Sequence, residues 1–209
     1  MVAIVDYGVG NLFSLQCSLE YIGQSCVVSG DEAVLAAADR IILPGVGAFG
    51  DAAAALCSRG LDGVLRRVAG AGKPLLGICL GMQLLFERSF EYGEHKGLGL
   101  IPGEVVPLGP DLLDRSCRVP QIGWNGLAVA DPGCPLLKSI CPGDAVYYVH
   151  SYYAPRGKYT AAWSGYGRAE ISGVVWRGNV FGTQFHPEKS GDAGLALLWD
   201  FCRTEQEAR

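Results

Sequence analysis

The 209 residues of this chain are 49% hydrophobic and 18% charged, and the formal net charge is −4. This composition is typical of a compact globular protein with one α/β domain and excludes a disordered chain. The mild charge and the lack of a basic stripe argue against nucleic-acid binding, and no apolar run of about 18 residues predicts a membrane span.

Short apolar segments alternate with helical patterns in the first half of the chain. The segment 2–6 predicts a strand, and the segment 11–22 carries Leu12, Leu15 and Leu19 at helical spacing. Further strands are predicted at 26–29, 40–43 and 74–78, and further helices at 48–57, 61–69 and 80–87. Strands that alternate with helices form a parallel sheet with right-handed crossovers, and strands without polar alternation are covered on both faces.

Glycine, proline and aromatic residues become frequent after about residue 100. Strands separated by turns are predicted at 145–150, 159–163, 173–176 and 180–184, and an amphipathic helix at 191–204. We expect this half to be a mixed or antiparallel extension of the same sheet. The prediction is an α/β fold with a single three-layer domain over residues 1–209, in which helices flank a mainly parallel central sheet.

The segment Lys73-Pro-Leu-Leu-Gly-Ile-Cys-Leu-Gly-Met-Gln83 is the most informative part of the chain. It predicts a buried strand that breaks at a Gly-x-Cys-x-Gly turn and enters a helix, which is the layout of a nucleophile elbow. The glycines suit a tight turn with no room beside the nucleophile. The N-terminus of the helix favours the thiolate form of Cys79. We therefore expect an enzyme with a cysteine nucleophile.

A cysteine nucleophile needs a base and a group that orients the base. His186 and Glu188 lie in Gly182-Thr-Gln-Phe-His-Pro-Glu188, just after a predicted strand. In extended backbone, residues i and i+2 face the same side, so the carboxylate can hold one ring nitrogen while the other faces sulfur. Taken alone, a His-Pro-Glu tripeptide more often serves a turn.

The turn Pro44-Gly-Val-Gly47 also follows a predicted strand. It is therefore expected at the same carboxyl edge of the sheet as Cys79, where ligands bind. Glycine allows a backbone N–H group to turn toward a developing oxyanion, although such a turn alone could be an ordinary strand-to-helix connection. The segment Gly8-Val-Gly10 lacks the third glycine and the acidic partner of a dinucleotide fingerprint, so no cofactor is predicted.

The other histidines and the cysteines have ordinary interpretations. His150 is a candidate second base, but the preferred hypothesis is that it orders a loop, and His95 is expected to be solvated. Eight cysteines without a Cys-x-x-Cys pair give little support for a zinc site, so no metal is predicted. Apart from Cys79, most cysteines are expected to be buried, inert thiols without disulfides. The N-terminus has no signal-peptide pattern, which favours the cytoplasm.

Together these motifs resemble the class I, triad-type glutamine amidotransferases. Four further segments narrow the resemblance to the family of glutaminase subunits of imidazole glycerol phosphate synthases. They are Asp6-Tyr-Gly-Val-Gly-Asn-Leu12, Leu43-Pro-Gly-Val-Gly-Ala-Phe-Gly-Asp51, Pro120-Gln-Ile-Gly-Trp-Asn125 and Gln184-Phe-His-Pro-Glu-Lys-Ser190. The resemblance runs from residue 6 to about 190 and implies a flavodoxin-like fold. Some members have Pro-His-Met-Gly-Trp-Asn where this chain has Gln121 and Ile122.

The resemblance implies a role for each matching residue. Cys79, His186 and Glu188 would form the catalytic triad. The backbone of Leu80 and of Val46 or Gly47 would form the oxyanion hole. Residues expected to bind glutamine are Gln83, Glu91, Ser151 and Tyr152, with backbone from Gly47, and Glu94 is an alternative to Glu91. Residues expected at a partner interface are Asn11, Trp124, Tyr147 and Lys189.

The resemblance also implies a reaction and a partner. The chain would hydrolyse glutamine to glutamate and ammonia and pass ammonia to a (β/α)₈-barrel cyclase subunit in a heterodimer. That cyclase makes imidazole glycerol phosphate and aminoimidazole carboxamide ribotide in histidine biosynthesis. Activity of the subunit alone would be low until the cyclase docks and a peptide near Gly47 turns.

Three alternatives remain at this point. A catalytically silent relative would not need to keep Cys79, His186 and Glu188 together. A glutaminase with another partner, for a pyridoxal phosphate or para-aminobenzoate pathway, is opposed by the motifs at 7–12 and 121–125. A cysteine peptidase of related fold would not require Gln83 or the turn at 44–47.

Overall fold

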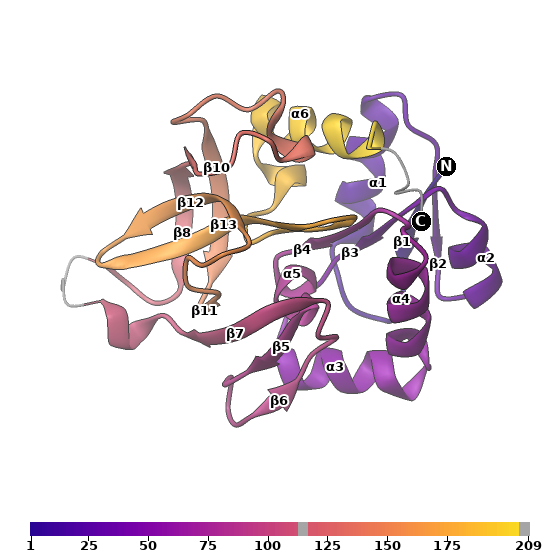
Figure 1. Cartoon of the computed structure of the whole chain (residues 1–209), viewed down its shortest axis with the longest axis horizontal. Helices are drawn as coiled ribbons and strands as arrows, with labels where there is room; N and C mark the ends of the chain where they lie inside the picture. The colour runs from indigo at the N-terminus through magenta and orange to yellow at the C-terminus, as the bar shows by residue number, and fades with distance from the viewer. Residues whose placement is uncertain (113–116, 205–209) are drawn as a thin grey trace.

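The computed structural model describes residues 1–112 and 117–204, and an eight-stranded sheet runs through its centre (Figure 1). The strand order is β2-β1-β3-β4-β14-β13-β12-β9. The parallel strands are β1 (Val2–Val5), β2 (Cys26–Ser29), β3 (Arg40–Leu43), β4 (Leu75–Ile78) and β14 (Val180–Thr183). The antiparallel strands are β13 (Ala169–Arg177), β12 (Thr160–Tyr166) and β9 (Ala128–Val129).

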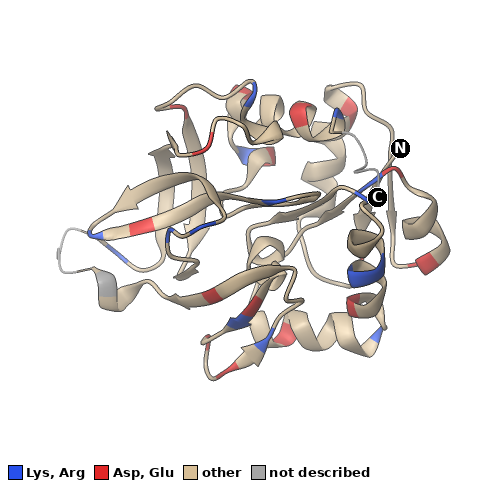
Figure 2. Cartoon of the chain, in the orientation of Figure 1, with Lys and Arg blue, Asp and Glu red and all other residues tan. Residues whose placement is uncertain are grey.

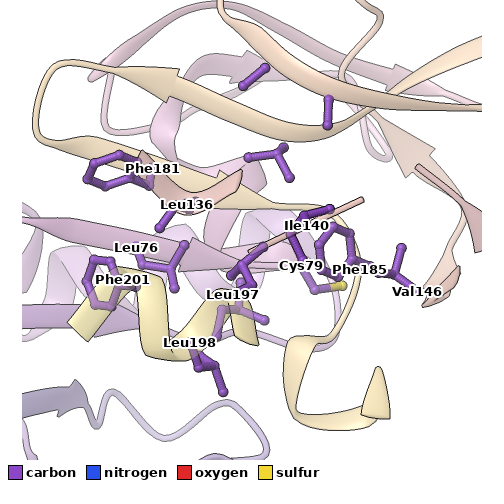
Figure 3. Packing of buried hydrophobic residues seen from close by; sticks show 14 of the residues in the cluster. Leu76, Cys79, Leu136, Ile140, Val146, Phe181, Phe185, Leu197, Leu198 and Phe201 are labelled. Carbon is purple, nitrogen blue, oxygen red and sulfur yellow. The ribbon is translucent and has the colours of Figure 1, made fainter. Parts of the chain in front are cut away.

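Helices cover both faces of the parallel strands. One face carries α1 (Leu12–Tyr21) and α6 (Gly191–Cys202), and the other carries α2 (Glu32–Ala37), α3 (Phe49–Ser58) and α4 (Leu61–Gly70). Successive residues of a strand point to opposite faces, so Val2 and Ile4 pack with α1 and α6, whereas Ala3 and Val5 pack with the other helices. Figure 3 shows the first of these cores, where the ring of Phe181 lies 6.1 Å from that of Phe201. The predicted three-layer α/β fold is confirmed.

The second half of the chain adds two small sheets. Strand β10 (Ala145–His150) pairs antiparallel with β8 (Gln121–Gly126). The other sheet has the order β11-β7-β5-β6, from β11 (Tyr152–Tyr153), β7 (Ile101–Pro107), β5 (Phe86–Ser89) and β6 (His95–Lys96). Short 3₁₀ turns lie at η1 (Gly109–Asp111), η2 (Pro135–Leu137) and η3 (Pro187–Lys189). The expected mixed and antiparallel extension is therefore present.

The helix predicted at 80–87 is shorter than expected. Helix α5 ends at Leu85, and Phe86 begins β5, which pairs with β7. The following loop explains the early end, because the amides of Leu98 and Leu100 donate to the carbonyl groups of Leu84 and Leu85 at 2.7 and 2.9 Å. These bonds satisfy the last carbonyl groups of the helix and leave Phe86 free to pair as a strand.

Sequence reasoning missed one helix and six strands of the described residues. Helix α2 (Glu32–Ala37) is capped by Asp31, whose carboxylate accepts hydrogen bonds from the amides of Ala33 and Val34, and the sequence carries this N-cap signal. The missed strands are β5, β6, β7, β8, β9 and β11. Strands β6, β9 and β11 have only two residues each, and β5, β7 and β8 contain charged residues, glycine or proline, so distant partners define these strands more than local pattern does.

The register of three adjacent strands determines where the site forms. Gly77 of β4 lies beside Leu43 of β3 and beside Gly182 of β14. Since these strands are parallel, the loops that follow them leave at one edge of the sheet. Acidic and basic residues are interspersed along the ribbon (Figure 2). Within the described residues, none of the helices is long and apolar enough to cross a lipid bilayer.

Candidate active site

Cys79 occupies a strained turn between β4 and α5 (Leu80–Leu85). Its φ of 54° and ψ of −111° lie outside the regions that a residue with a side chain adopts easily. Two hydrogen bonds hold this backbone: the Cys79 amide donates to Thr183 O at 2.7 Å, and Cys79 O accepts from the Gln83 amide at 3.1 Å. The turn is thus a nucleophile elbow, held in its strained conformation by the neighbouring strand and the helix.

The two glycines of the elbow are required by backbone packing. A Cβ atom on Gly77 would lie 2.5 Å from Gly81 O, and one on Gly81 would lie 1.9 Å from Leu43 O. Both distances are shorter than van der Waals contact. The glycines therefore let α5 pack directly onto the ends of β3 and β4, which is how the helix N-terminus comes to lie beside the sulfur.

His186 and Glu188 form a buried pair. His186 Nδ1 lies 2.8 Å from Glu188 Oε1, and each side chain is 3% exposed. The His186 amide donates to Tyr147 O at 3.0 Å, and Ser190 Oγ donates to His186 O at 2.6 Å, which fixes the segment between β14 and α6. The carboxylate therefore fixes the orientation of the ring, and Nε2 is the nitrogen left for another partner.

The sulfur of Cys79 and the ring of His186 face one cavity and interact. Burial alone lowers the pKa of His186, but the Cys79 side chain and the Glu188 carboxylate outweigh it and raise that pKa to about 9. Nε2 is buried and forms no regular hydrogen bond with any described residue. The sulfur of Cys79 and the imidazole of His186 thus interact electrostatically. Catalytic hydrogen bonds are often loose before substrate binds and tighten in its presence.

The cavity has a volume of about 340 Å³. Twelve residues line it: Val46, Gly47, Cys79, Leu80, Gln83, Glu91, Pro120, Val149, His150, Ser151, Tyr152 and His186. Every residue expected in the oxyanion hole or against glutamine is among them. The cavity is large enough for a small amino acid and lies at the carboxyl edge of the parallel strands.

Gln83 and Glu91 occupy different walls of this cavity. Gln83 is buried, and its Nε2 donates to Tyr152 O at 2.9 Å. Glu91 Oε2 accepts from the Phe49 amide at 2.6 Å, at the N-terminus of α3. Glu94 has a side chain that is 58% exposed and pairs with Arg88 at 3.6 Å. Of the two glutamates considered, Glu91 is the one that lines the cavity.

The turn at 44–47 packs against the N-terminus of α5 and contributes Val46 and Gly47 to the cavity. Gly47 has a φ of 99°, a conformation that favours glycine. The Tyr7 hydroxyl donates to Pro44 O at 2.8 Å, and burial, followed by the charge on Cys79, raises the pKa of this phenol. Tyr7 therefore stays protonated and anchors the start of the turn.

Three of the four expected interface residues gather near η3. Trp124 of β8 is 58% exposed, and its ring lies 6.0 Å from that of Tyr147 of β10 at an interplanar angle of 71°. Lys189 is exposed in η3, whose residues lie beside β10. The fourth residue, Asn11, lies near Glu188 and His186 across a small cavity.

Comparisons with known proteins identify the family of this chain. The family model described as "Glutamine amidotransferase class-I" matches residues 3–203. The chain belongs to the class-I glutamine amidotransferase family.

Among the relatives of this amidotransferase, a protein of Lacticaseibacillus casei (strain BL23) named "Imidazole glycerol phosphate synthase subunit HisH" is 49% identical, over 100% of this chain and 98% of that protein. A protein of the same name from Listeria monocytogenes serotype 4b (strain CLIP80459) is 47% identical, over 99% and 100%. A solved structure titled "Crystal structure of glutamine amidotransferase" matches with a TM-score of 0.73 at 19% identity, over 97% of this chain and 100% of that one. This last likeness shows the fold alone.

His150 of the amidotransferase is a neutral structural residue beside the cavity. It is buried at the end of β10, and burial lowers its pKa to about 4. Nδ1 lies 3.0 Å from Tyr152 O, and Nε2 lies 2.9 Å from Gln121 Oε1. A neutral ring carries one proton and cannot donate to two acceptors, so the Gln121 amide must turn its NH₂ group toward Nε2. The ring orders the segment 150–152, as one of the two hypotheses for His150 expected.

Removal of this ring should change how stability depends on pH. The pKa of His150 is lower in the folded state, about 4, than its ordinary value of 6.5, so the unfolded chain binds the extra proton as the pH falls between these values. The wild type should lose roughly 2–3 kcal/mol of unfolding free energy on this account between pH 7 and pH 4. In urea titrations at pH 7 and pH 4, the unfolding free energy of His150→Gln should fall less between the two pH values than that of the wild type. Parallel losses in the two proteins would contradict this assignment.

Two expectations about polar residues are wrong. His95 is not solvated in a loop: it lies in β6, and its ring packs over Gly50, where a Cβ atom would come within 2.7 Å of the ring. The cysteines are not mostly buried. Besides Cys79, only Cys134 and Cys202 are buried, while Cys17, Cys57 and Cys141 are exposed and Cys26 and Cys117 are intermediate. All eight are free thiols. No group of three or more His, Cys, Asp or Glu side chains in residues 1–112 and 117–204 could hold a metal ion.

Proposed function

We propose that this chain hydrolyses glutamine to glutamate and ammonia as the glutaminase subunit of an imidazole glycerol phosphate synthase. The observation that carries the proposal is that one cavity contains the strained Cys79 and the buried His186–Glu188 pair. Nearly full-length relatives named as HisH subunits of that synthase support the choice of complex. The pathway would be histidine biosynthesis, with residues 1–209 acting as one amidotransferase domain in the cytoplasm.

The reaction would begin with attack of the Cys79 thiolate on the side-chain amide carbon of glutamine. The C=O electron pair moves onto oxygen, and the backbone N–H groups of Leu80 and of Val46 or Gly47 hold the resulting oxyanion. Removal of one such donor typically lowers the rate by about 10²–10³-fold. These three residues line the cavity beside the sulfur.

His186 would move the protons of both half-reactions. As the tetrahedral intermediate collapses, its Nε2–H protonates the amide nitrogen, which leaves as ammonia, and a glutamyl thioester remains. The neutral ring then removes a proton from water, which attacks the thioester, and the sulfur leaves as thiolate with glutamate as the product. Glu188 holds Nδ1–H through both steps and stabilises the imidazolium.

The other walls of the cavity would select the substrate. Glu91 presents a carboxylate that can pair with the α-ammonium group of glutamine, while Gln83, Ser151 and Tyr152 offer hydrogen-bonding groups. A cavity of about 340 Å³ with these convergent polar groups suits one amino acid.

The partner would be a (β/α)₈-barrel cyclase that forms a heterodimer with this chain and receives the ammonia. Exposed Trp124 and Lys189, with Tyr147 and Asn11, are proposed to contact it. Docking would favour the Gly47 conformation that completes the oxyanion hole, so the isolated subunit would turn over slowly.

The proposal is tested by measuring glutamate and ammonia release from glutamine, with the chain alone and with a cyclase subunit and its nucleotide substrate. We expect turnover that rises strongly when the loaded partner is present. Absence of glutamine hydrolysis in the assembled complex would overturn the proposal, and equal rates with and without the partner would refute the regulated part.

A further inference from the structure

Gln184 contacts the nucleophile, although neither its spacing in the sequence nor the proposed triad assigns it a role. It follows β14, is 0% exposed, and its Nε2 donates to Cys79 Sγ at 3.8 Å. Its Oε1 accepts from Gln83 Nε2 at 3.1 Å. Because sulfur is large, hydrogen bonds to it are longer than those to oxygen, and a buried amide in this position is a donor aimed at the reacting atom.

The direction of this amide is fixed by its neighbours. Tyr152 O is a backbone carbonyl group, which can only accept, so the NH₂ group of Gln83 must face it at 2.9 Å. The same NH₂ group supplies its second hydrogen to Gln184, which must therefore turn Oε1 to Gln83 and NH₂ to the sulfur. The opposite orientation would place two NH₂ groups against each other.

The carbonyl group of Tyr152, which sets the direction of the Gln83 amide, also contacts the ring of His150. His150 Nδ1 lies 3.0 Å from Tyr152 O, and the far side of the ring is paired with Gln121 of β8. All four polar side chains of this hydrogen-bond chain are buried: Gln121, His150, Gln83 and Gln184. A buried polar chain is stable only when every member is satisfied, so reversing one amide would leave others unpaired.

We propose that Gln184 is a further catalytic residue, which donates a hydrogen bond to the sulfur of Cys79 and stabilises its thiolate. This inference rests on the proposed glutaminase function and deepens it. A donor to the anionic form of a group favours that form. His186 gives its Nε2 proton to the amide nitrogen that leaves as ammonia, whereas the Gln184 amide keeps its hydrogens and can donate to the sulfur when it leaves the thioester.

The test is the pH dependence of Cys79 alkylation by iodoacetamide in the full chain, for wild type, Gln184→Leu and Gln184→Glu. Peptide mass spectrometry separates Cys79 from the exposed Cys17, Cys57 and Cys141. A hydrogen bond to a charged group contributes enough to change the thiolate fraction about tenfold, so Gln184→Leu should move the alkylation midpoint up by about one pH unit. Gln184→Glu turns an oxygen toward the sulfur and should shift it at least as far.

Two controls separate this role from simple packing. Gln24→Leu removes a glutamine side chain from the turn after α1 and should leave Cys79 alkylation unchanged, and alkylation of Cys17 should be equal in every variant. Wild-type alkylation profiles at Cys79 in a folded Gln184→Leu or Gln184→Glu protein would overturn the proposal. If Gln184→Leu does not fold, the isosteric Gln184→Glu decides. If neither folds, Gln184→Asn, which shortens the amide's reach, decides by the same shift. Alkylation needs no glutamine turnover, so an inactive wild type that still shows the shift would refute only the proposed function.

Discussion

Replacing Cys79 with alanine should lower glutamine-dependent ammonia production by the assembled complex about 10⁴-fold or more, because no other group in the cavity can form the thioester. Alanine keeps the Cβ atom and the backbone hydrogen bonds of the elbow, so the fold should survive. The measurement is glutamate release, and the cyclase reaction supplied with external ammonia should continue at its normal rate.

Cys134→Ala is the matched control for this change. Cys134 is also buried, and burial raises the pKa of its thiol to about 12, so it is inert. We expect its glutaminase rate to stay within about twofold of wild type, even if packing is weakened. A Cys79→Ala complex that retains glutamine-dependent activity would show that another nucleophile acts.

Replacing Glu188 with glutamine should lower the glutaminase rate by about 10³–10⁴-fold, as expected when a triad carboxylate is removed with little change of shape. The glutamine NH₂ group can donate to Nδ1, which places the ring proton on Nε2 and leaves that nitrogen unable to accept a proton from the Cys79 thiol or from water. The expected result is a large fall in the rate of the chemical step, measured by single-turnover glutamate release. Glu170→Gln, at an exposed carboxylate paired with Arg156, is the control and should have normal activity.

Glu188→Gln should also change how the free energy of unfolding depends on pH. The pKa of His186 in the folded protein is about 9, above its ordinary value of 6.5, so its protonation contributes stability that is complete below pH 6.5 and lost as the pH rises through 9. Since Glu188 supplies part of this shift, Glu188→Gln should be most destabilised relative to wild type near pH 6 and less so near pH 9.5. A difference in unfolding free energy that does not vary with pH would contradict this account.

The parallel half of the fold could be predicted because its signals are local. Strands β1 to β4 are short apolar segments, and helices α1, α3 and α4 carry periodic apolar faces. The placement of the turn at 44–47 and of Cys79 at one edge followed from the rule that parallel strands end together. The pairing of His186 with Glu188 is present, but the extended backbone from which it was expected is not, because Glu188 lies in η3.

The parts that could not be predicted depend on distant partners. Nothing local distinguishes Gln121, Gln184 and His150 from polar residues that interrupt strands, because their roles appear only when three segments meet around Tyr152 O. The early end of α5 depends on a loop more than ten residues later, and the packing of the His95 ring over α3 depends on the absence of a side chain at Gly50. Such features are properties of the assembled tertiary structure.

At Cys79 the strained backbone makes stability and catalytic activity compete at a single position. A residue with a side chain held at a φ of 54° and ψ of −111° carries strain of about 1–3 kcal/mol, which glycine would relieve. A glycine there would give a sturdier protein with no nucleophile. Laboratory selection for heat resistance without selection for glutamine hydrolysis should therefore replace Cys79 early. Stabilised variants of this chain are best screened for ammonia release from the first round.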